Sequence, residues 1–342
     1  GGILPARSVG LVRRVFFYTF TIESAGALLL FARFRSHMPF ETALWSAVFH
    51  SVSAFCNAGF SLYSTSFMDY SADLYVNLIM TGLIILGGLG FVVMADIASF
   101  LKSKTKKESR HNLSLHSRSV LYTTLILIIA GAVLIGILES DNLLKDRPFK
   151  ESILTSIFLS ITPRTAGFNT LDTGSLTTAT LLTLIPLMII GASPGSTGGG
   201  IKTTTFAATF ALVKSELRQR TSVELLNRQI PNEIIIKALA TIVGFLLVLF
   251  TGVFLLQITE SWAASREVVR GRFLDYLFET ASALGTVGLS TGITPVLSTA
   301  GKYIIIICMF VGRLGPLAVA TSLIGRRTVE QYRLPEEKLM VG

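Results

Sequence analysis

Long apolar segments alternate with short polar connections along the chain. Residues 15–34, 119–138 and 233–257 each have about the twenty-residue length that a helix needs to cross a bilayer. A shorter apolar run of roughly a dozen residues follows each of them, at 45–55, 153–161 and 273–284. Such a run cannot cross a bilayer and is tolerated at membrane depth only when protein surrounds it. The pattern therefore predicts three spanning outer helices, each followed by a buried half helix.

A short glycine-centred motif ends each half helix. The copies are Asn57-Ala58-Gly59-Phe60, Thr165-Ala166-Gly167-Phe168 and Thr286-Val287-Gly288-Leu289. Glycine readily takes the positive backbone angles that let successive carbonyls point the same way. A row of carbonyls that replaces the water around a cation forms a potassium filter, and Thr-Val-Gly-Leu differs by one letter from the Thr-Val-Gly-Tyr core of potassium channels. The repeat predicts three filter strands with backbone carbonyls as ion ligands.

A third apolar segment, at 74–101, 176–217 and 302–323, predicts an inner helix that completes each repeat. In the first of them, glycines predict a smooth face for close helix packing, at Gly82, Gly87, Gly88 and Gly90. We predict an all-α membrane protein whose units surround a central ion pore. The units occupy residues 1–101, 102–217 and 218–342, and the last includes a cytoplasmic tail.

The middle inner segment is too long for one span, because as a single helix it would run about 60 Å. Glycines, hydroxyls and a proline interrupt it at Gly191, Ala192, Ser193, Pro194, Gly195, Ser196, Thr197, Gly198, Gly199, Gly200, Lys202 and Thr203. Residues 176–190 cover only about 22 Å at helical rise, so the break lies within the membrane. Irregular backbone at that depth has to line a water-filled path. We predict a gating loop beneath the filter and one interrupted inner helix.

Two alternatives compete for this loop. It could be a structural turn between two helices, although its depth and its hydroxyls argue against that. It could also be a nucleotide-binding P-loop, which would make the chain an ATP-hydrolysing membrane subunit that uses Lys202. The P-loop pattern fails because Ile201 stands before the lysine and a membrane-length apolar segment precedes the loop.

Composition supports an integral membrane protein, since 51% of residues are hydrophobic, 15% are charged and the mean hydropathy is +0.63. The net charge of +9 does not indicate nucleic-acid binding, because the basic residues gather in short loops. These loops and the tail are predicted to be cytoplasmic by the positive-inside rule. Their basic residues are Lys102, Lys104, Lys106, Lys107, Arg110 and Arg118 against Glu108, then Lys214, Arg218, Arg220 and Arg228 against Glu216 and Glu224, then Arg326 and Arg327.

Few other residues suggest chemistry. Cys56 and Cys308 give neither a disulfide framework nor metal-ligand spacing. The histidines, which also lack ligand spacing, are interpreted as interfacial or loop residues: His37, His50, His111 and His116. The chain does not begin with methionine, and we expect it to start partway through a longer protein.

These motifs together resemble the Trk/Ktr/HKT superfamily of potassium transporters, most closely its bacterial Ktr membrane subunits, with the Trk subunits as the near alternative. The resemblance rests on the three filters, on the 191–205 loop and on Phe310-Val311-Gly312-Arg313-Leu314-Gly315. It implies four pore units around one pore, of which this chain would hold the second, third and fourth. It also implies potassium uptake across the bacterial plasma membrane, without enzyme activity or a cofactor.

The resemblance further assigns roles to residues and partners. Gly59, Gly167 and Gly288 would be the filter glycines, and Arg313 would face the cavity beneath the filter. Arg313 could instead extend to the cytoplasmic interface, and Lys202 could be either a gate residue or an interface anchor. The expected partners are a second copy in a homodimer, the lipid bilayer, and a cytosolic nucleotide-binding regulatory ring of the KtrA or TrkA kind. Sodium remains open as a coupling ion, as does a sodium-selective member of the superfamily.

Overall fold

The computed structural model describes residues 6–105, 112–263, 269 and 271–324. The helices are α1 (Ala6–Phe34), α2 (Phe40–Phe55), α3 (Leu74–Leu89), α4 (Phe91–Thr105), α5 (Leu115–Leu138), α6 (Phe149–Ile161), α7 (Thr178–Ile189), α8 (Thr203–Leu217), α9 (Asn232–Ala263), α11 (Phe273–Gly285), α12 (Thr299–Leu314) and α13 (Pro316–Ile324). A two-stranded hairpin, β1 (Glu224–Leu225) with β2 (Arg228–Gln229), follows α8. The predicted basic residues Lys106, Lys107, Arg110, Arg326 and Arg327 lie outside the described residues, as do Glu108 and His111.

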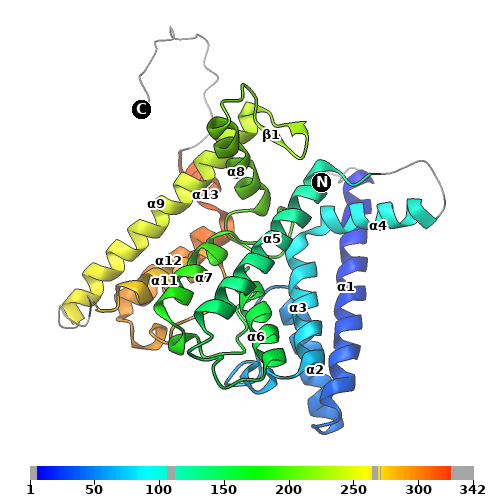
Figure 1. The fold of residues 1–342 in the computed structure, drawn as a ribbon, viewed down its shortest axis with the longest axis vertical. Coiled ribbons are helices and arrows are strands. Elements are labelled where there is room, and N and C mark those ends of the chain that lie inside the picture. Colours follow the sequence, from blue (N-terminus) through cyan, green and yellow to red (C-terminus); the bar gives the residue numbers. More distant parts are fainter. Residues whose placement is uncertain (1–5, 106–111, 264–268, 270, 325–342) are drawn as a thin grey trace, which may run out of the picture.

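Among the described residues, three single helices are long and apolar enough to cross a membrane, and they confirm the predicted outer helices. The qualifying segments are Val12–Phe34 of α1, Leu115–Leu138 of α5 and Asn232–Trp262 of α9. In Figure 1, α1 and α9 stand at opposite edges of the molecule, with shorter helices between them. After each outer helix come a short helix, an irregular glycine strand and an interrupted inner helix, so this order occurs three times. The protein is an integral membrane protein.

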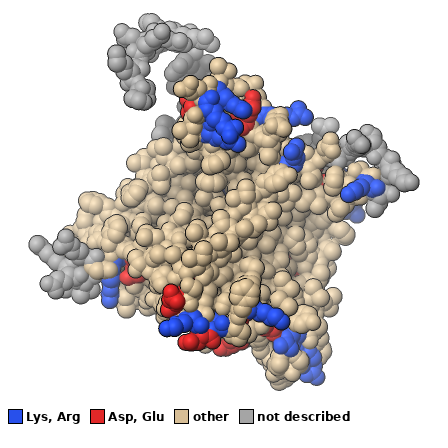
Figure 2. All heavy atoms as spheres, viewed as in Figure 1, with Lys and Arg blue, Asp and Glu red and all other residues tan. Residues whose placement is uncertain are grey.

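Charged residues gather at two opposite ends of the molecule. Figure 2 shows a broad uncharged band between a mostly basic end, near α8 and the hairpin, and an end of mixed charge. A belt of this kind is what a bilayer requires of the surface it covers. The distribution matches the charges predicted for the inner and outer loops.

The three short helices α2, α6 and α11 supply the buried centre. The last two turns of each are largely inaccessible, and the buried cores include Phe55, Phe158 and Phe278. Proline precedes α2 and α6, as Pro39 and Pro148, where its fixed φ suits a helix start. The prediction of buried half helices is confirmed.

A polar contact ties the end of each outer helix to the start of the following inner helix. Glu139, just after α5, accepts hydrogen bonds from the Thr177 N–H at 2.9 Å and hydroxyl at 3.0 Å. Glu260 near the end of α9 accepts from the Ser298 N–H at 3.1 Å and hydroxyl at 2.7 Å. In the first unit a cation replaces the acid, and Arg33 pairs with Asp73 at 2.6 Å. Thr177, Ser298 and Asp73 are N-caps, so one contact fixes where each inner helix begins.

The prediction of a continuous inner helix at 74–101 is wrong. The segment divides into α3 and α4, which meet at an angle of 101°. Gly90 lies between them with φ 85°, and a Cβ there would stand 2.6 Å from the Pro194 carbonyl oxygen. The Phe91 N–H, which opens α4, donates to the Gly195 carbonyl at 3.2 Å. The predicted gating loop therefore occupies the space that a straight helix would need.

Two further details of the inner helices differ from the prediction. The last inner helix, predicted at 302–323, breaks at Gly315, whose φ is 89°, and α13 restarts at Pro316. Glycine in the left-handed region followed by proline is a typical helix stop, because proline cannot continue the hydrogen-bond ladder. Gly87 and Gly88 do allow close packing, whereas a Cβ on Gly82 would meet nothing within 4 Å. All three inner helices are thus interrupted, where the sequence predicted one interruption.

The contact at Glu139 yields a stability prediction. Glu139 is fully buried, and its replacement by alanine would leave the Thr177 N–H without an acceptor and the Asn142 amide with only its bond to the Ser175 carbonyl. We expect Glu139→Ala to lower the free energy of unfolding by about 2 kcal/mol, the usual range for a lost bond to a buried charged group. Thermal unfolding in detergent measures this. The exposed neighbour Asp141→Ala is the control and should unfold like the parent; equal midpoints for both variants would contradict the capping role.

Candidate functional site

The three glycine motifs share one unusual backbone conformation. The first residue of each is left-handed although it is not glycine, with φ 50° at Asn57, 70° at Thr165 and 54° at Thr286. Two residues later the glycine is also at positive φ, at 72° in Gly59, 78° in Gly167 and 93° in Gly288. Alternating the sign of φ along an extended chain turns successive carbonyls toward the same side. The motif residues can therefore present a row of carbonyl oxygens.

The half helices hold these strands through hydrogen bonds in their last turn. The residue after the left-handed position donates its N–H back into the helix: Ala58 to Ser53 at 2.9 Å, Ala166 to Thr162 at 3.0 Å and Val287 to Ser282 at 2.8 Å. The side chains of the same helix residues bond the strand again. Ser53 donates to the Phe60 carbonyl at 2.8 Å, Thr162 donates to the Phe168 carbonyl, and Ser282 accepts from the Gly288 N–H at 3.2 Å. Sequence analysis missed these three hydroxyls.

The strands lie against one another in chain order. A Cβ added to Gly59 would stand 2.5 Å from the Ala166 carbonyl oxygen, and one added to Gly167 would collide with the Val287 carbonyl oxygen. Each carbonyl thus faces the glycine of the preceding strand, and no other residue fits there. At Gly288 the nearest atom is 3.9 Å away, which is ordinary contact. The three motifs therefore converge on one site, which the C-terminal ends of the three half helices lead into, and a helix C-terminus favours a cation.

The loop between α7 and α8 lies directly against the inner end of this site. A Cβ on Gly198 would collide with the Thr165 hydroxyl, and one on Gly199 with the Thr286 hydroxyl. The loop is compact because its two ends are joined: the Ile201 N–H donates to the Ile189 carbonyl at 2.9 Å. The predicted break in this inner helix is confirmed, since α7 ends at Ile189 and α8 begins at Thr203.

Hydrogen bonds hold the loop to two other units. The Ser193 N–H donates to Gly88 at 2.9 Å, and the Thr197 hydroxyl reaches the carbonyls of Phe55 and Gly87, both at 3.3 Å. Arg313 donates from Nη1 to the Thr197 carbonyl at 2.6 Å. The loop is therefore tied to α2, α3 and α12 by bonds from single side chains and backbone groups.

The two candidate cations both contact the loop. Lys202 donates from Nζ to the Gly198 carbonyl at 2.7 Å, so it closes the loop upon itself. Arg313 stands in the last turn of α12 and remains exposed while it bonds Thr197. Neither side chain has an acidic partner among the described residues. Both positively charged side chains therefore donate hydrogen bonds to backbone carbonyls of the loop.

A search for related proteins gives the family. Residues 3–330 match the model of the TrkH family, which is described as a cation transport protein. The chain belongs to this TrkH family. It is 40% identical to the Ktr system potassium uptake protein B of Bacillus subtilis, over 98% of this chain and 72% of that protein. It is 34% identical to the potassium/sodium uptake protein NtpJ of Enterococcus hirae, over 95% of this chain and 70% of that protein.

A solved structure shares the fold of this TrkH family chain. The crystal structure of the potassium transporter TrkH from Vibrio parahaemolyticus superposes with a TM-score of 0.70 at 18% identity. The match covers 94% of this chain and 65% of that one, so the chain spans somewhat less than two thirds of the solved protein. At this identity the likeness concerns the fold alone.

Two buried residues of this TrkH family chain escaped sequence analysis. His50, predicted to be an interfacial or loop residue, is fully buried in α2, and that prediction is wrong. Its Nδ1 lies 2.8 Å from the Ser46 carbonyl and its Nε2 accepts from the Leu62 N–H at 3.2 Å, so the proton is on Nδ1. Arg164 is also buried, next to the filter, where it donates to the Thr124 hydroxyl at 3.2 Å. Its Nε has no partner among the described residues, and we have no physical account of that.

A series of three glycine substitutions tests the strand geometry. Gly82→Ala adds a methyl group in open space and should be neutral or slightly stabilising, because alanine favours helices. Gly288→Ala adds only the strain of a positive φ, about 1 to 2 kcal/mol. Gly167→Ala adds the same strain and the collision with Val287, and should cost about 3 kcal/mol or more. Thermal unfolding ranks the variants, and equal losses at Gly167 and Gly288 would refute the close approach of the strands.

Proposed function

We propose that this protein takes up potassium ions through a gated pore, as the membrane subunit of a Ktr or Trk type system. The observation that carries the proposal is the set of three glycine strands that lie against one another and alternate the sign of φ. Carbonyls in that arrangement can replace the hydration shell of a monovalent cation without covalent chemistry. The printed names of the relatives, which include two potassium uptake proteins B, support the choice of ion.

The proposed ion ligands are the backbone carbonyls of the three motifs. They come from Asn57, Ala58, Gly59, Phe60, Thr165, Ala166, Gly167, Phe168, Thr286, Val287, Gly288 and Leu289. Sodium is the second candidate, because one relative is named a potassium/sodium uptake protein. Ion preference is measured by competing rubidium, a potassium substitute, against sodium in cells that depend on this protein for potassium. Uptake that sodium supports as well as potassium would overturn the potassium assignment.

The loop is proposed as the gate. It comprises Gly191, Ala192, Ser193, Pro194, Gly195, Ser196, Thr197, Gly198, Gly199, Gly200, Lys202 and Thr203. Its contact with the Thr165 and Thr286 hydroxyls supports a position across the ion path, directly inside the filter. Its bonds to other elements are few and separate, so each neutral one can be exchanged at a cost of about 1 kcal/mol and the bond from Arg313 at about 2 kcal/mol. A partner that binds two states of the protein with different affinity could therefore open it.

We also propose the partners. A cytosolic nucleotide-binding regulatory ring of the KtrA or TrkA kind would dock on the basic inner end of the protein, and two copies of the membrane subunit would form a homodimer. The basic residues at that end support the first proposal, since they would attract an acidic partner surface. Sodium could act there or in the pore as an activating ion.

Removing Arg313 tests the gate from outside the loop. Arg313→Ala removes the bond to the Thr197 carbonyl and a positive charge beside the path, so we expect ion flux per molecule to rise several-fold. Flux is measured in lipid vesicles that contain the protein purified from cells without truncation. Lys302→Ala is the matched control, because Lys302 lies on the same helix and bonds only the Pro295 carbonyl at the opposite end. Equal flux in the two variants would contradict a role of Arg313 in gating and would favour the alternative in which it extends to the cytoplasmic interface.

Shortening the loop tests the gate itself. Deleting residues 195–200 removes backbone from the path, whereas α7 and α8 retain their own packing. Flux should then rise and lose its dependence on the regulatory ring. Size-exclusion profiles establish that the variant is folded and assembled. A folded variant that conducts less than the parent and still responds to the ring would place the gate elsewhere.

A further inference from the structure

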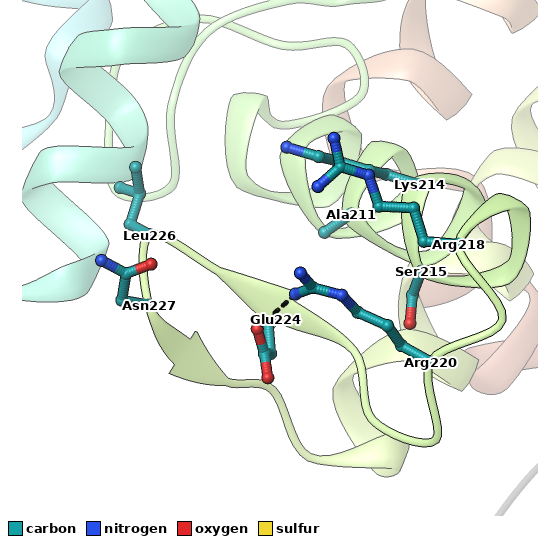
Figure 3. Close-up of a pocket in the computed structure, with 8 residues that line it drawn as sticks. All are labelled: Ala211, Lys214, Ser215, Arg218, Arg220, Glu224, Leu226 and Asn227. Carbon is teal, nitrogen blue, oxygen red and sulfur yellow. Dashed lines mark hydrogen bonds and ion pairs between the residues drawn. The ribbon is translucent and has the colours of Figure 1, made fainter.

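A small basic pocket lies at the inner end of α8, away from the ion path. It forms between the last turn of α8 and the β1–β2 hairpin and has a volume of about 170 Å³. Figure 3 shows Lys214 and Arg218 extending from α8, with Arg220 and Glu224 near them. The full lining is Ala211, Lys214, Ser215, Arg218, Arg220, Glu224, Leu226 and Asn227. No step of the proposed transport uses this pocket.

More positively charged than negatively charged side chains line the pocket. Arg220 pairs with Glu224 at 2.6 Å, and both side chains are nearly half exposed. Lys214 and Arg218 have no carboxylate partner among the described residues. Three cations thus face one carboxylate, and two of the cations are free to bind an anion.

A tight turn, a hydrogen bond and a small buried cluster hold the walls of the pocket in place. Leu226 and Asn227 both take left-handed backbone angles, with φ 50° and 62°, which is the tight hairpin turn whose twist matches the strands. The hairpin is fastened to α8 by the Ser215 hydroxyl, which donates to the Ser222 carbonyl at 2.8 Å. Val223 packs against Ala211 in a small buried cluster beneath it. The cations are therefore presented by a supported surface.

An apolar groove adjoins the pocket and shares its two free cations. The groove is lined by Phe210, Val213, Lys214, Leu217 and Arg218. Its three apolar side chains are strongly exposed, with Leu217 at 81%. Since α8 ends at the basic end of the uncharged band, a groove with exposed apolar side chains at this place suits the boundary between headgroups and acyl chains. Lys214 and Arg218 stand at the boundary between the two surfaces.

We propose that this site binds an anionic phospholipid of the inner leaflet. The phosphate would lie between Lys214 and Arg218, with Arg220 as a further donor, and an acyl chain would follow the groove along Val213 and Leu217. Arginine and lysine are the usual ligands of lipid phosphates at this level of a membrane. A soluble anion would use the pocket and leave the groove empty, whereas a phospholipid matches both surfaces. The exposed apolar groove also favours a lipid over an acidic protein surface.

Lipid binding to the purified protein tests the proposal. Native mass spectrometry counts lipids retained from phosphatidylglycerol and, separately, from zwitterionic phosphatidylcholine. The double variant Lys214→Gln, Arg218→Gln should bind phosphatidylglycerol about thirtyfold more weakly, which corresponds to about 2 kcal/mol for two interfacial cations. Binding of phosphatidylcholine should change little. The control Lys104→Gln, Lys237→Gln removes the same charge from exposed positions outside the pocket and should bind like the parent.

Two further measurements keep the test decisive if the double variant does not fold. In the unaltered protein, raising the salt concentration should weaken phosphatidylglycerol binding and spare phosphatidylcholine. Val213→Ser with Leu217→Ser should weaken lipid binding, and inorganic phosphate should not displace the lipid at millimolar concentration.

Three results would overturn the proposal. Unchanged phosphatidylglycerol binding in the Lys214 and Arg218 variant would show that the pocket takes no lipid phosphate. Displacement by inorganic phosphate, with no effect of the groove substitutions, would assign the pocket to a soluble anion. If the Lys214 and Arg218 variant no longer bound the regulatory subunit but still bound phosphatidylglycerol, the pocket would be assigned to a protein partner.

Discussion

Backbone polar groups that leave the helical ladder inside a membrane must find partners within the protein, because the hydrocarbon offers none. In this chain the backbone is not helical at the three glycine strands and at the 190–202 loop. Hydrogen bonds to neighbouring elements satisfy many of the polar backbone groups of these segments. The strands bond back to their own half helices, and the loop bonds to α2, α3 and α12. Under the proposed function, an ion bound by the remaining carbonyls would replace the missing partner. The long outer helices α1 and α9 stand at the two edges of the molecule, on either side of this polar centre (Figure 1).

Glycine makes this mutual arrangement possible because the segments touch backbone to backbone. Gly59 and Gly167 lie against carbonyls of the next strand, and Gly198 and Gly199 lie against threonine side chains. Gly87 in α3 likewise lies against the Phe55 carbonyl at the end of a half helix. A single methyl group at any of these places would separate two elements of the ion path. Close approach, more than conformational freedom, is therefore the common requirement.

Much of this site could be predicted from the sequence, because its signals are lengths and repeats. Three motifs in equivalent positions predicted the strands, and a segment too long for one span predicted the broken helix. The bends at Gly90 and Gly315 could not be predicted, because one glycine in an apolar run is compatible with a straight helix. At Gly90 the bend depends on the Pro194 carbonyl, which is distant in sequence. His50 and Arg164 were missed for the same reason: their partners come together only in the fold.

The contacts between the loop and the glycine strands also determine how the two segments can influence each other. Thr165 and Thr286 hold left-handed backbone angles, which are costly for β-branched residues and persist only when their surroundings fix them. Gly198 and Gly199 are part of those surroundings. Asn57 differs, because its side-chain amide can bond the Ala54 carbonyl at 3.0 Å, the Ile84 carbonyl at 3.2 Å and the Thr165 hydroxyl. Withdrawal of the loop would therefore remove support from two strands while the first kept its own. The ends of the second and third strands that contact the loop are thus the part of the site whose shape depends on the position of the loop.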